Sequence, residues 1–189
     1  MRDREEVAAV AARVLERHPR LDVLVNNAGV AARTGFLDGD EQRIEDVVRT
    51  NYLGSVWCTR GFLPGLAAGS HVVNVVSIAG AVAVGPYSAS KHAQLAFSRT
   101  LAVELGRRGI SVHTILPGWV ETPGFPQATR LGPLLARLVV EPEFVAERIL
   151  DAIDHDRREI VVPRWYRPAA WAQALVPGAF ARVQTRLRR

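Results

Sequence analysis

Short apolar runs alternate with amphipathic segments along most of the chain. Val, Ile and Leu make up most positions of the runs, which is typical of strands buried on both faces of a parallel sheet. In the first amphipathic segment, Val7, Val10, Ala11 and Val14 follow helical spacing. The pattern predicts strands at 21–25, 71–77, 110–116 and 159–163, and helices at 4–17, 40–66, 87–106 and 143–154.

The alternation of helix and strand predicts an α/β fold with a parallel sheet covered on both faces. Ligands of such sheets bind in the crevice beyond the carboxyl ends of the strands. Three predicted strands bring polar or turn residues to that edge: "NNAG" at 26–29, Ser77, and "PG" at 117–118. We therefore expect the functional site there.

Composition narrows the class of protein. The length of 189 residues fits one domain, and the net charge of +5 comes from arginines scattered through most of the chain, so we predict no nucleic-acid groove. Cys58 is the only cysteine, which excludes an intramolecular disulfide and fits a reducing compartment. The histidines lack metal-ligand spacing, and no apolar run or signal peptide points to a membrane. We expect a cytoplasmic protein without a metal site.

Tyr87 and Lys91 are the first candidates for catalysis. Lys91 is the only lysine of the chain, and it follows Tyr87 by one helical turn, so both share a helix face. An ammonium about 4 Å from the phenol would contribute on the order of 4 kcal/mol and lower the pKa of Tyr87 by up to about three units. The start of a helix at Pro86 would act in the same direction. The alternative is an ordinary surface pair.

Ser77 and Asn51 are polar residues in unusual places. Ser77 ends a buried strand, where it could bind a substrate oxygen or act as a strand-end cap. Asn51 lies on an apolar helix face with Ile44, Val47 and Val48, so its amide needs buried partners. It is either a satisfied core amide or a polar group of the site.

Together these residues resemble the short-chain dehydrogenase/reductase (SDR) family. The resemblance covers most of the stretch from 21 to 122, and a single Tyr-x-x-x-Lys would be weak without the other motifs. In order, the matching motifs are "NNAG" at 26–29, Asn51 within "RTNYLGS", Ser77 within "NVVSIAG", "YSASK" at 87–91 and "PGWVET" at 117–122. The resemblance implies a Rossmann-like, doubly wound sheet and an NAD(P)-dependent oxidoreductase that interconverts an alcohol and a carbonyl.

The resemblance also implies roles for single residues. Tyr87 would exchange a proton with the substrate oxygen as general acid/base, and Ser77 would orient that oxygen. Lys91 would lower the pKa of Tyr87 and bind the nicotinamide ribose, and Asn51 would hold a water that links Lys91 to solvent. The implied cofactor-binding residues are Asn26, Ala28, Gly29, Tyr87, Lys91, Pro117, Gly118, Val120 and Thr122.

The glycine-rich phosphate-binding turn of the family has no counterpart in this chain. About 60 residues of the family pattern would precede residue 1, so the sheet is expected to be partial. The strand at 21–25 would then lack a neighbour on one side, and the helix at 4–17 would lose part of its cover. We expect a shortened gene product or fragment; a genuine short form, silent or completed by another chain, is the alternative. The choice between NAD and NADP is not readable from these residues.

A fluorescence titration with NADH or NADPH tests this expectation. Without a phosphate-binding turn the 189 residues should bind a nicotinamide cofactor weakly. Micromolar binding would contradict the expectation of a shortened form.

Two segments outside the motifs suggest further contacts. Residues 123–140 fall where the family has its substrate lid within the predicted domain 1–163; they indicate either a lipophilic or aromatic substrate or a plain surface helix. The tail at 164–189 combines six arginines and several aromatic residues with no acidic residue. It is either a membrane-surface helix or a helix packed on the domain or on a second copy in a homo-oligomer. Besides the oxidoreductase, a silent SDR relative acting as an interaction or membrane-surface protein therefore stays open.

Overall fold

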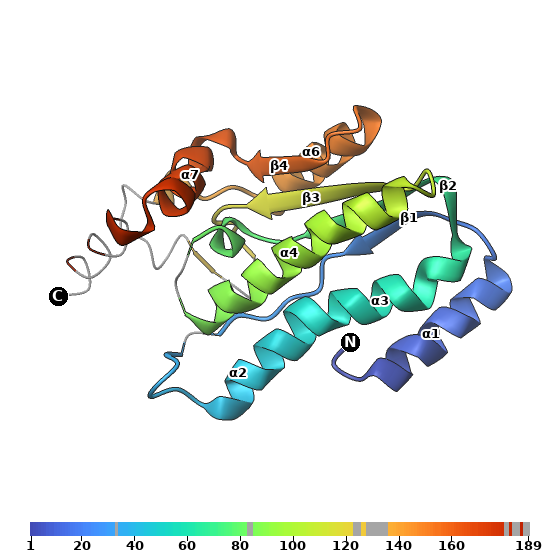
Figure 1. The fold of residues 1–189 in the computed structure, drawn as a ribbon, viewed down its shortest axis with the longest axis horizontal. Helices are drawn as coiled ribbons and strands as arrows, with labels where there is room; N and C mark the ends of the chain where they lie inside the picture. The colour runs from blue at the N-terminus through green and yellow to red at the C-terminus, as the bar shows by residue number, and fades with distance from the viewer. Residues whose placement is uncertain are drawn as a thin grey trace.

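A parallel sheet forms the centre of the protein. The computed structural model describes residues 1–32, 34–82, 85–122, 126–127, 136–179, 182 and 186. Within them, four strands lie in the order β1-β2-β3-β4, and each neighbouring pair is parallel (Figure 1). The strands are β1 (Leu21–Asn26), β2 (Leu66–Val75), β3 (Ser111–Pro117) and β4 (Glu159–Val162). The predicted α/β class and Rossmann-like sheet are confirmed.

Helices connect and cover these strands. Asp40 caps the second helix through a bond from the Gln42 amide, at the start of the helix predicted at 40–66. In the described residues the helices are α1 (Arg4–Arg17), α2 (Glu41–Val47), a π-helical segment (Val48–Leu53), α3 (Gly54–Phe62), α4 (Pro86–Gly106), α6 (Pro142–Asp154) and α7 (Arg167–Leu175). Among them, none is both long enough and apolar enough to cross a bilayer.

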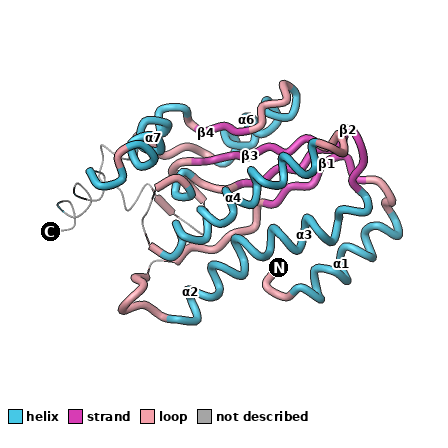
Figure 2. The backbone as a smooth tube through the Cα atoms, viewed as in Figure 1, coloured by secondary structure: helices cyan, strands magenta, loops and turns pink. Residues whose placement is uncertain are grey.

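The two faces of the sheet carry different helices. Side chains of a strand alternate between the faces, so Val72 and Val73 of β2 point in opposite directions. Val72 packs with Leu101 and Leu105 of α4, whereas Val73 packs with Val145 of α6. Helix α4 therefore covers one face and α6 the other, and α1 and α3 lie in the layer of α4 (Figures 1 and 2).

Strand β1 lies at one edge of the sheet. In the described part of the chain its only hydrogen-bonded neighbour is β2. Val23 and Val25 are 44% and 49% exposed, although their neighbours on β2 are covered. Helix α1 keeps cover through α3, because Val7 and Ala11 are buried and Ala11 lies under Gly61. Among the described residues the predicted open edge is confirmed, and the cover of α1 is partial as predicted, because α3 covers Val7 and Ala11 while Val10 is 44% exposed.

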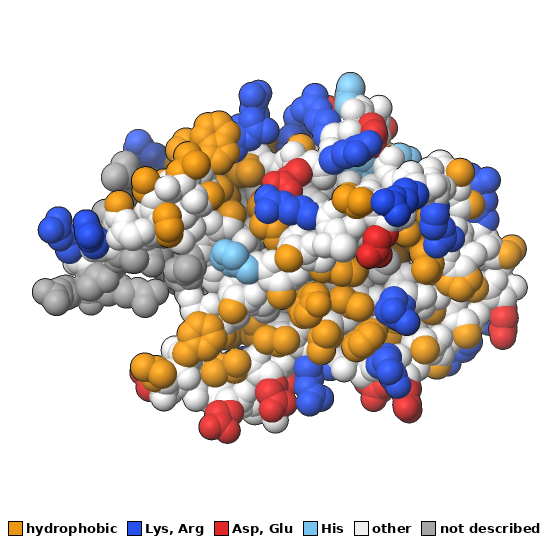
Figure 3. Space-filling view, in the orientation of Figure 1, with side chains coloured by type: hydrophobic (Ala, Val, Ile, Leu, Met, Phe, Trp, Pro, Cys, Tyr) orange, Lys and Arg blue, Asp and Glu red, His pale blue; other side chains and the backbone are white. Residues whose placement is uncertain are grey.

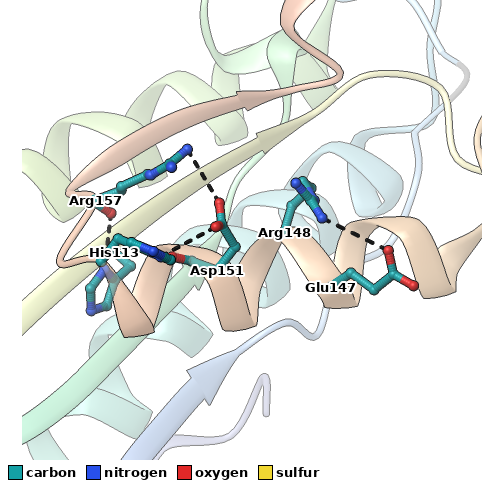
Figure 4. A network of polar contacts seen from close by, with 6 residues as sticks. His113, Glu147, Arg148, Asp151 and Arg157 are labelled. Atoms are coloured by element: carbon teal, nitrogen blue, oxygen red, sulfur yellow. Dashed lines mark hydrogen bonds and ion pairs between the residues drawn. The ribbon is translucent and has the colours of Figure 1, made fainter.

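A polar network ties the end of α6 to the sheet. Arg157, in the turn before β4, pairs with Asp151 of α6 at 3.2 Å, and its carbonyl bonds with Nδ1 of His113 on β3 at 3.0 Å (Figure 4). The other ring nitrogen of His113 bonds with His71 of β2 at 3.0 Å. These bonds fix the direction in which the chain enters β4.

Candidate active site

The carboxyl ends of the strands meet at one edge, as predicted from the sequence. Asn26 ends β1, Ser77 follows β2, and Pro117 ends β3. The register places Asn26 beside Asn74 and Val75 beside Ile115, so the three strand ends are neighbours. The first turn of α4 begins over this edge at Pro86. The residues that follow these strands therefore form one rim.

Ser77 and Tyr87 come together on this rim. Ser77 lies close enough to the Tyr87 hydroxyl for hydrogen bonding from Ser77 to lower the pKa of the phenol in part. The Ser77 hydroxyl accepts the Ala79 amide at 3.1 Å and lies 3.5 Å from the Pro117 carbonyl. Both residues are only partly buried. A ligand at the rim can thus reach the phenol and the hydroxyl together.

Lys91 lies behind this pair, in the interior. It is 3% exposed, and its ammonium donates to the Val75 carbonyl at 3.1 Å and to Gln94 Oε1 at 2.7 Å. Its Nζ lies 5.9 Å from the ring centroid of Tyr87. Tyr87 and Lys91 therefore share one side of α4, as their spacing predicts.

The pKa values of this pair differ from the prediction. Burial raises the pKa of Tyr87 above its usual value, and the hydrogen bond with Ser77 lowers it in part. Burial lowers the pKa of Lys91 to about 7. The prediction that Tyr87 has a lowered pKa is therefore wrong. The cause is burial, which removes water from both groups and disfavours the charged form of each. The ammonium donates to Val75 and Gln94 and does not offset the burial of the phenol.

Asn51 joins the first strand end to the helices. It is fully buried, its Oδ1 accepts the Val30 amide at 2.8 Å, and its Nδ2 donates to the Val30 carbonyl at 3.0 Å and to Ser90 Oγ at 3.0 Å. It lies in the π-helical segment, a geometry frequent at functional sites. Asn51 is thus a satisfied amide that positions the loop after β1, and its role in holding a water stays a prediction.

Replacement of Asn51 by Ala should lower the free energy of unfolding by about 2–4 kcal/mol, because the Val30 amide and carbonyl lose their buried partners. Urea unfolding measures the change. Asn27→Ala is the matched control, since Asn27 is an exposed amide on the same loop. A loss below about 1 kcal/mol would contradict the positioning role.

The other predicted residues of the first strand end divide into two groups. Asn26 is 2% exposed and donates its amide to Thr59 at 3.0 Å and to Asn74 at 2.8 Å, so its side chain connects strands and α3 and does not face the rim. Ala28 and Gly29 are exposed. A Cβ at Gly29 would lie 3.4 Å from Asn51 Oδ1 and 3.7 Å from Lys91 Nζ. Gly29 therefore leaves the approach to the buried ammonium open.

The loop after β3 forms the opposite side of the rim. The Gly118 amide donates to the Val162 carbonyl at 2.8 Å, and Val120 pairs with Val140. Thr122 follows and is partly buried. Of the predicted lid at 123–140, residues 126–127 and 136–140 are described; 123–125 and 128–135 lie outside the described residues.

Tyr166 packs directly on Gly118. A Cβ at Gly118 would lie 2.1 Å from Cε2 of the Tyr166 ring. The Tyr166 hydroxyl donates to the Leu138 carbonyl at 3.0 Å, and the ring meets Trp119 edge-on with centroids 6.0 Å apart. The chain after β4 thus supports the loop that follows β3.

Gly118→Ala should destabilise the protein by about 1–3 kcal/mol, because the new methyl group overlaps the Tyr166 ring. The double variant Gly118→Ala/Tyr166→Ala should show a favourable coupling energy, since the overlap is gone. Gly106→Ala is the control, because a Cβ there meets nothing within 4 Å. Additive effects of the two substitutions in urea unfolding would refute the contact.

Sequence reasoning missed the residues around the ammonium. Gln94 is fully buried, accepts from Lys91 and donates to Ser55 Oγ at 2.9 Å, and Ser90 bonds with Asn51. The signal was present in the chain: Ser90, Gln94 and Ser98 recur every four residues beside Lys91. Small polar residues at helical spacing indicate a buried polar face of α4.

Comparison with known proteins decides the family. The sequence model described as short chain dehydrogenase matches residues 1–130. The chain belongs to the short chain dehydrogenase family. An estradiol 17-beta-dehydrogenase 11 of Mus musculus is 33% identical over 190 residues, which cover 95% of this chain and 62% of that protein. This short chain dehydrogenase sequence therefore spans about three fifths of the length of that curated relative.

Solved structures share the fold of this short chain dehydrogenase. A short chain dehydrogenase from Burkholderia cenocepacia in complex with NADP has a TM-score of 0.79 at 24% identity, over 94% of this chain and 73% of that one. One from Burkholderia phymatum in complex with NAD has a TM-score of 0.78 at 23% identity, over 92% and 72%. At these identities the likeness concerns the fold.

Proposed function

We propose that this chain carries the proton-transfer part of an NAD(P)-dependent oxidoreductase that interconverts an alcohol and a carbonyl. One observation carries the proposal: Ser77 and Tyr87 lie together on a partly exposed rim, and the ammonium of the buried Lys91 lies 5.9 Å from the Tyr87 ring. Family membership supports the same reaction class.

The residues present fit the nicotinamide end of such a cofactor. Gly29 leaves space beside the ammonium of Lys91, and Pro117 and Gly118 border the same rim. When bound, a nicotinamide would supply or accept the hydride. The two solved structures with NADP and NAD support either cofactor for this chain.

Tyr87 moves the proton in this proposal. Because its pKa is raised, the phenol is protonated at neutral pH, which is the form that donates a proton to a carbonyl oxygen. Ser77 holds that oxygen by a hydrogen bond. Lys91, with a pKa of about 7, exists in both protonation states at neutral pH and can return a proton to the phenolate. In the direction of alcohol oxidation the same transfers run in reverse.

A deuterium-transfer experiment tests the proposal. The chain is incubated with NADH or NADPH deuterated at the transferred position, and with estrone or a simple aliphatic ketone as acceptor. Estrone is included because the curated mouse relative is named for estradiol. We expect one deuterium at the carbinol carbon of a product. If none is transferred to any acceptor at cofactor concentrations that saturate binding, the proposal is refuted.

A further inference from the structure

Helix α7 exposes its apolar face. Trp171 is 63% exposed and Leu175, one turn later, is 79% exposed. Gln173 is more covered, and in the described part of the chain its Oε1 is buried without a hydrogen-bond partner. A surface helix normally turns its apolar side to the core and its polar side to water. The arrangement in α7 is the reverse, which indicates that its outer face meets something apolar.

Basic side chains surround this face. Arg164 lies two helical turns before Trp171, and Arg167 lies one turn before it. Trp165, 57% exposed, and Val176, 52% exposed, extend the apolar area. In the space-filling view, hydrophobic side chains gather over the region of α7 with Lys or Arg side chains beside them (Figure 3). We call Arg164, Trp165, Arg167, Trp171, Leu175 and Val176 the α7 surface.

A groove of about 560 Å³ continues from the α7 surface between α6 and β4. Its acidic residues already have partners: Asp151 pairs with Arg157 at 3.2 Å (Figure 4), and Glu159 pairs with Arg99 at 2.8 Å. Among the described residues, the groove arginines Arg158, Arg164 and Arg167 form no ion pair. The groove thus offers unpaired guanidinium groups next to exposed aromatic rings.

We propose that the α7 surface docks on an anionic lipid bilayer. An interfacial helix combines aromatic and aliphatic side chains that enter the boundary of the acyl chains with cations that bind lipid phosphates. The α7 surface has both, and residues 164–189 contain six arginines and no acidic residue. Guanidinium groups of the groove bind phosphate oxygens in pairs of hydrogen bonds.

A second copy of the chain suits this surface less well. In a twofold dimer the same patch faces itself, so Arg164 and Arg167 would meet their own counterparts without acidic partners. A nucleic acid would satisfy the charges and could stack on Trp165 and Trp171, but it would leave the aliphatic side chains of Leu175 and Val176 exposed to water. Charge and apolar area together therefore favour the lipid surface.

Vesicle flotation with the full 189-residue chain tests the proposal. The vesicles are pure phosphatidylcholine or phosphatidylcholine mixed with phosphatidylserine. We expect binding to the mixed vesicles and little to the neutral ones, with affinity falling as salt rises, because the Debye length shortens. Quenching of tryptophan fluorescence by brominated acyl chains should accompany binding.

Two double variants separate the contributions. Arg164→Gln/Arg167→Gln should weaken binding about 30-fold, which corresponds to about 1 kcal/mol for each cation near an anionic membrane. Arg13→Gln/Arg17→Gln on α1 makes the same charge change on exposed residues elsewhere and should bind like the unchanged chain. Leu175→Ser/Val176→Ser keeps every tryptophan and should weaken the fluorescence quenching, whereas Phe36→Ser/Leu37→Ser, at another exposed apolar pair, should keep it.

Three results would overturn the proposal. The first is equal binding to neutral and anionic vesicles, and the second is equal loss in the α7 and control variants. The third is binding to another partner in place of the bilayer. It would show as tighter binding to single-stranded RNA than to anionic vesicles, or as self-association in light scattering that Leu175→Ser/Val176→Ser abolishes while vesicles stay unbound. Circular dichroism of each variant shows whether it is folded. The test needs no enzymatic activity, so its outcome is independent of the proposed oxidoreduction.

Discussion

Tyr87→Phe should lower the turnover number for carbonyl reduction by about a thousandfold, because the variant removes the proton donor and keeps the ring. The measurement is the rate of deuterium transfer at saturating cofactor, compared with the unchanged chain. Cofactor affinity should change little, since the aromatic ring is retained. We expect a large effect because Tyr87 is the proposed proton donor and lies beside Ser77 on the rim.

Tyr52→Phe is the matched control for Tyr87→Phe. Tyr52 lies near the site in sequence but packs its ring edge-on against Phe97, with centroids 6.4 Å apart. Loss of its hydroxyl should leave the rate within about twofold, as for a surface substitution away from special features. If Tyr87→Phe retained more than about a tenth of the activity, another group would have to donate the proton.

Lys91 should make the stability of the protein depend on pH between about 7 and 10. Its pKa is about 7 in the folded chain against 10.5 as the usual value, so within this window the unfolded chain binds one proton more than the folded chain. The free energy of unfolding therefore rises with pH, by at most about 1.4 kcal/mol per pH unit and by about 3–5 kcal/mol in total. Below pH 7 both states are protonated, and this contribution is constant.

The comparison with Lys91→Met isolates this effect. Methionine keeps an unbranched stem but carries no proton, so the extra slope should vanish in the variant. Urea unfolding of both proteins at intervals between pH 6 and 10 gives the difference directly. Parallel curves would show that Lys91 keeps its proton in the folded chain throughout the window.

The strands were predictable because Val, Ile and Leu dominate them despite polar residues such as Asn74 and His113, but their limits were not. Strand β2 begins at Leu66, five residues before the predicted start, because Leu66 pairs with Leu21 and the Ser70 hydroxyl bonds the Leu21 carbonyl. The stretch "AAGS" at 67–70 has the composition of a turn. Pairing with another part of the chain decided its structure, and no local pattern contains that information.

The candidate site was predictable as a set of residues and less so in its electrostatics. Strand ends and helical spacing brought Ser77, Tyr87 and Lys91 to one place, as expected. The direction of the Tyr87 pKa was predicted wrongly, because spacing along a helix says nothing of how much water the surrounding protein removes. The helical spacing of Ser90, Gln94 and Ser98 could have indicated a polar face of α4, but that Gln94 accepts from the ammonium follows only from the position of its amide in three dimensions.

Because Tyr166 packs on Gly118, the loop after β3 depends on the C-terminal part of the chain for support. Shortening the protein after β4 would remove the ring that packs on Gly118 at the rim of the candidate site, together with the bond to Leu138. Helix α7 begins directly after Tyr166. If its outer side docks on a bilayer, the contact of Tyr166 with Gly118 would also fix the orientation of the candidate site relative to the lipid. Substrates dissolved in that lipid would then enter without crossing bulk water.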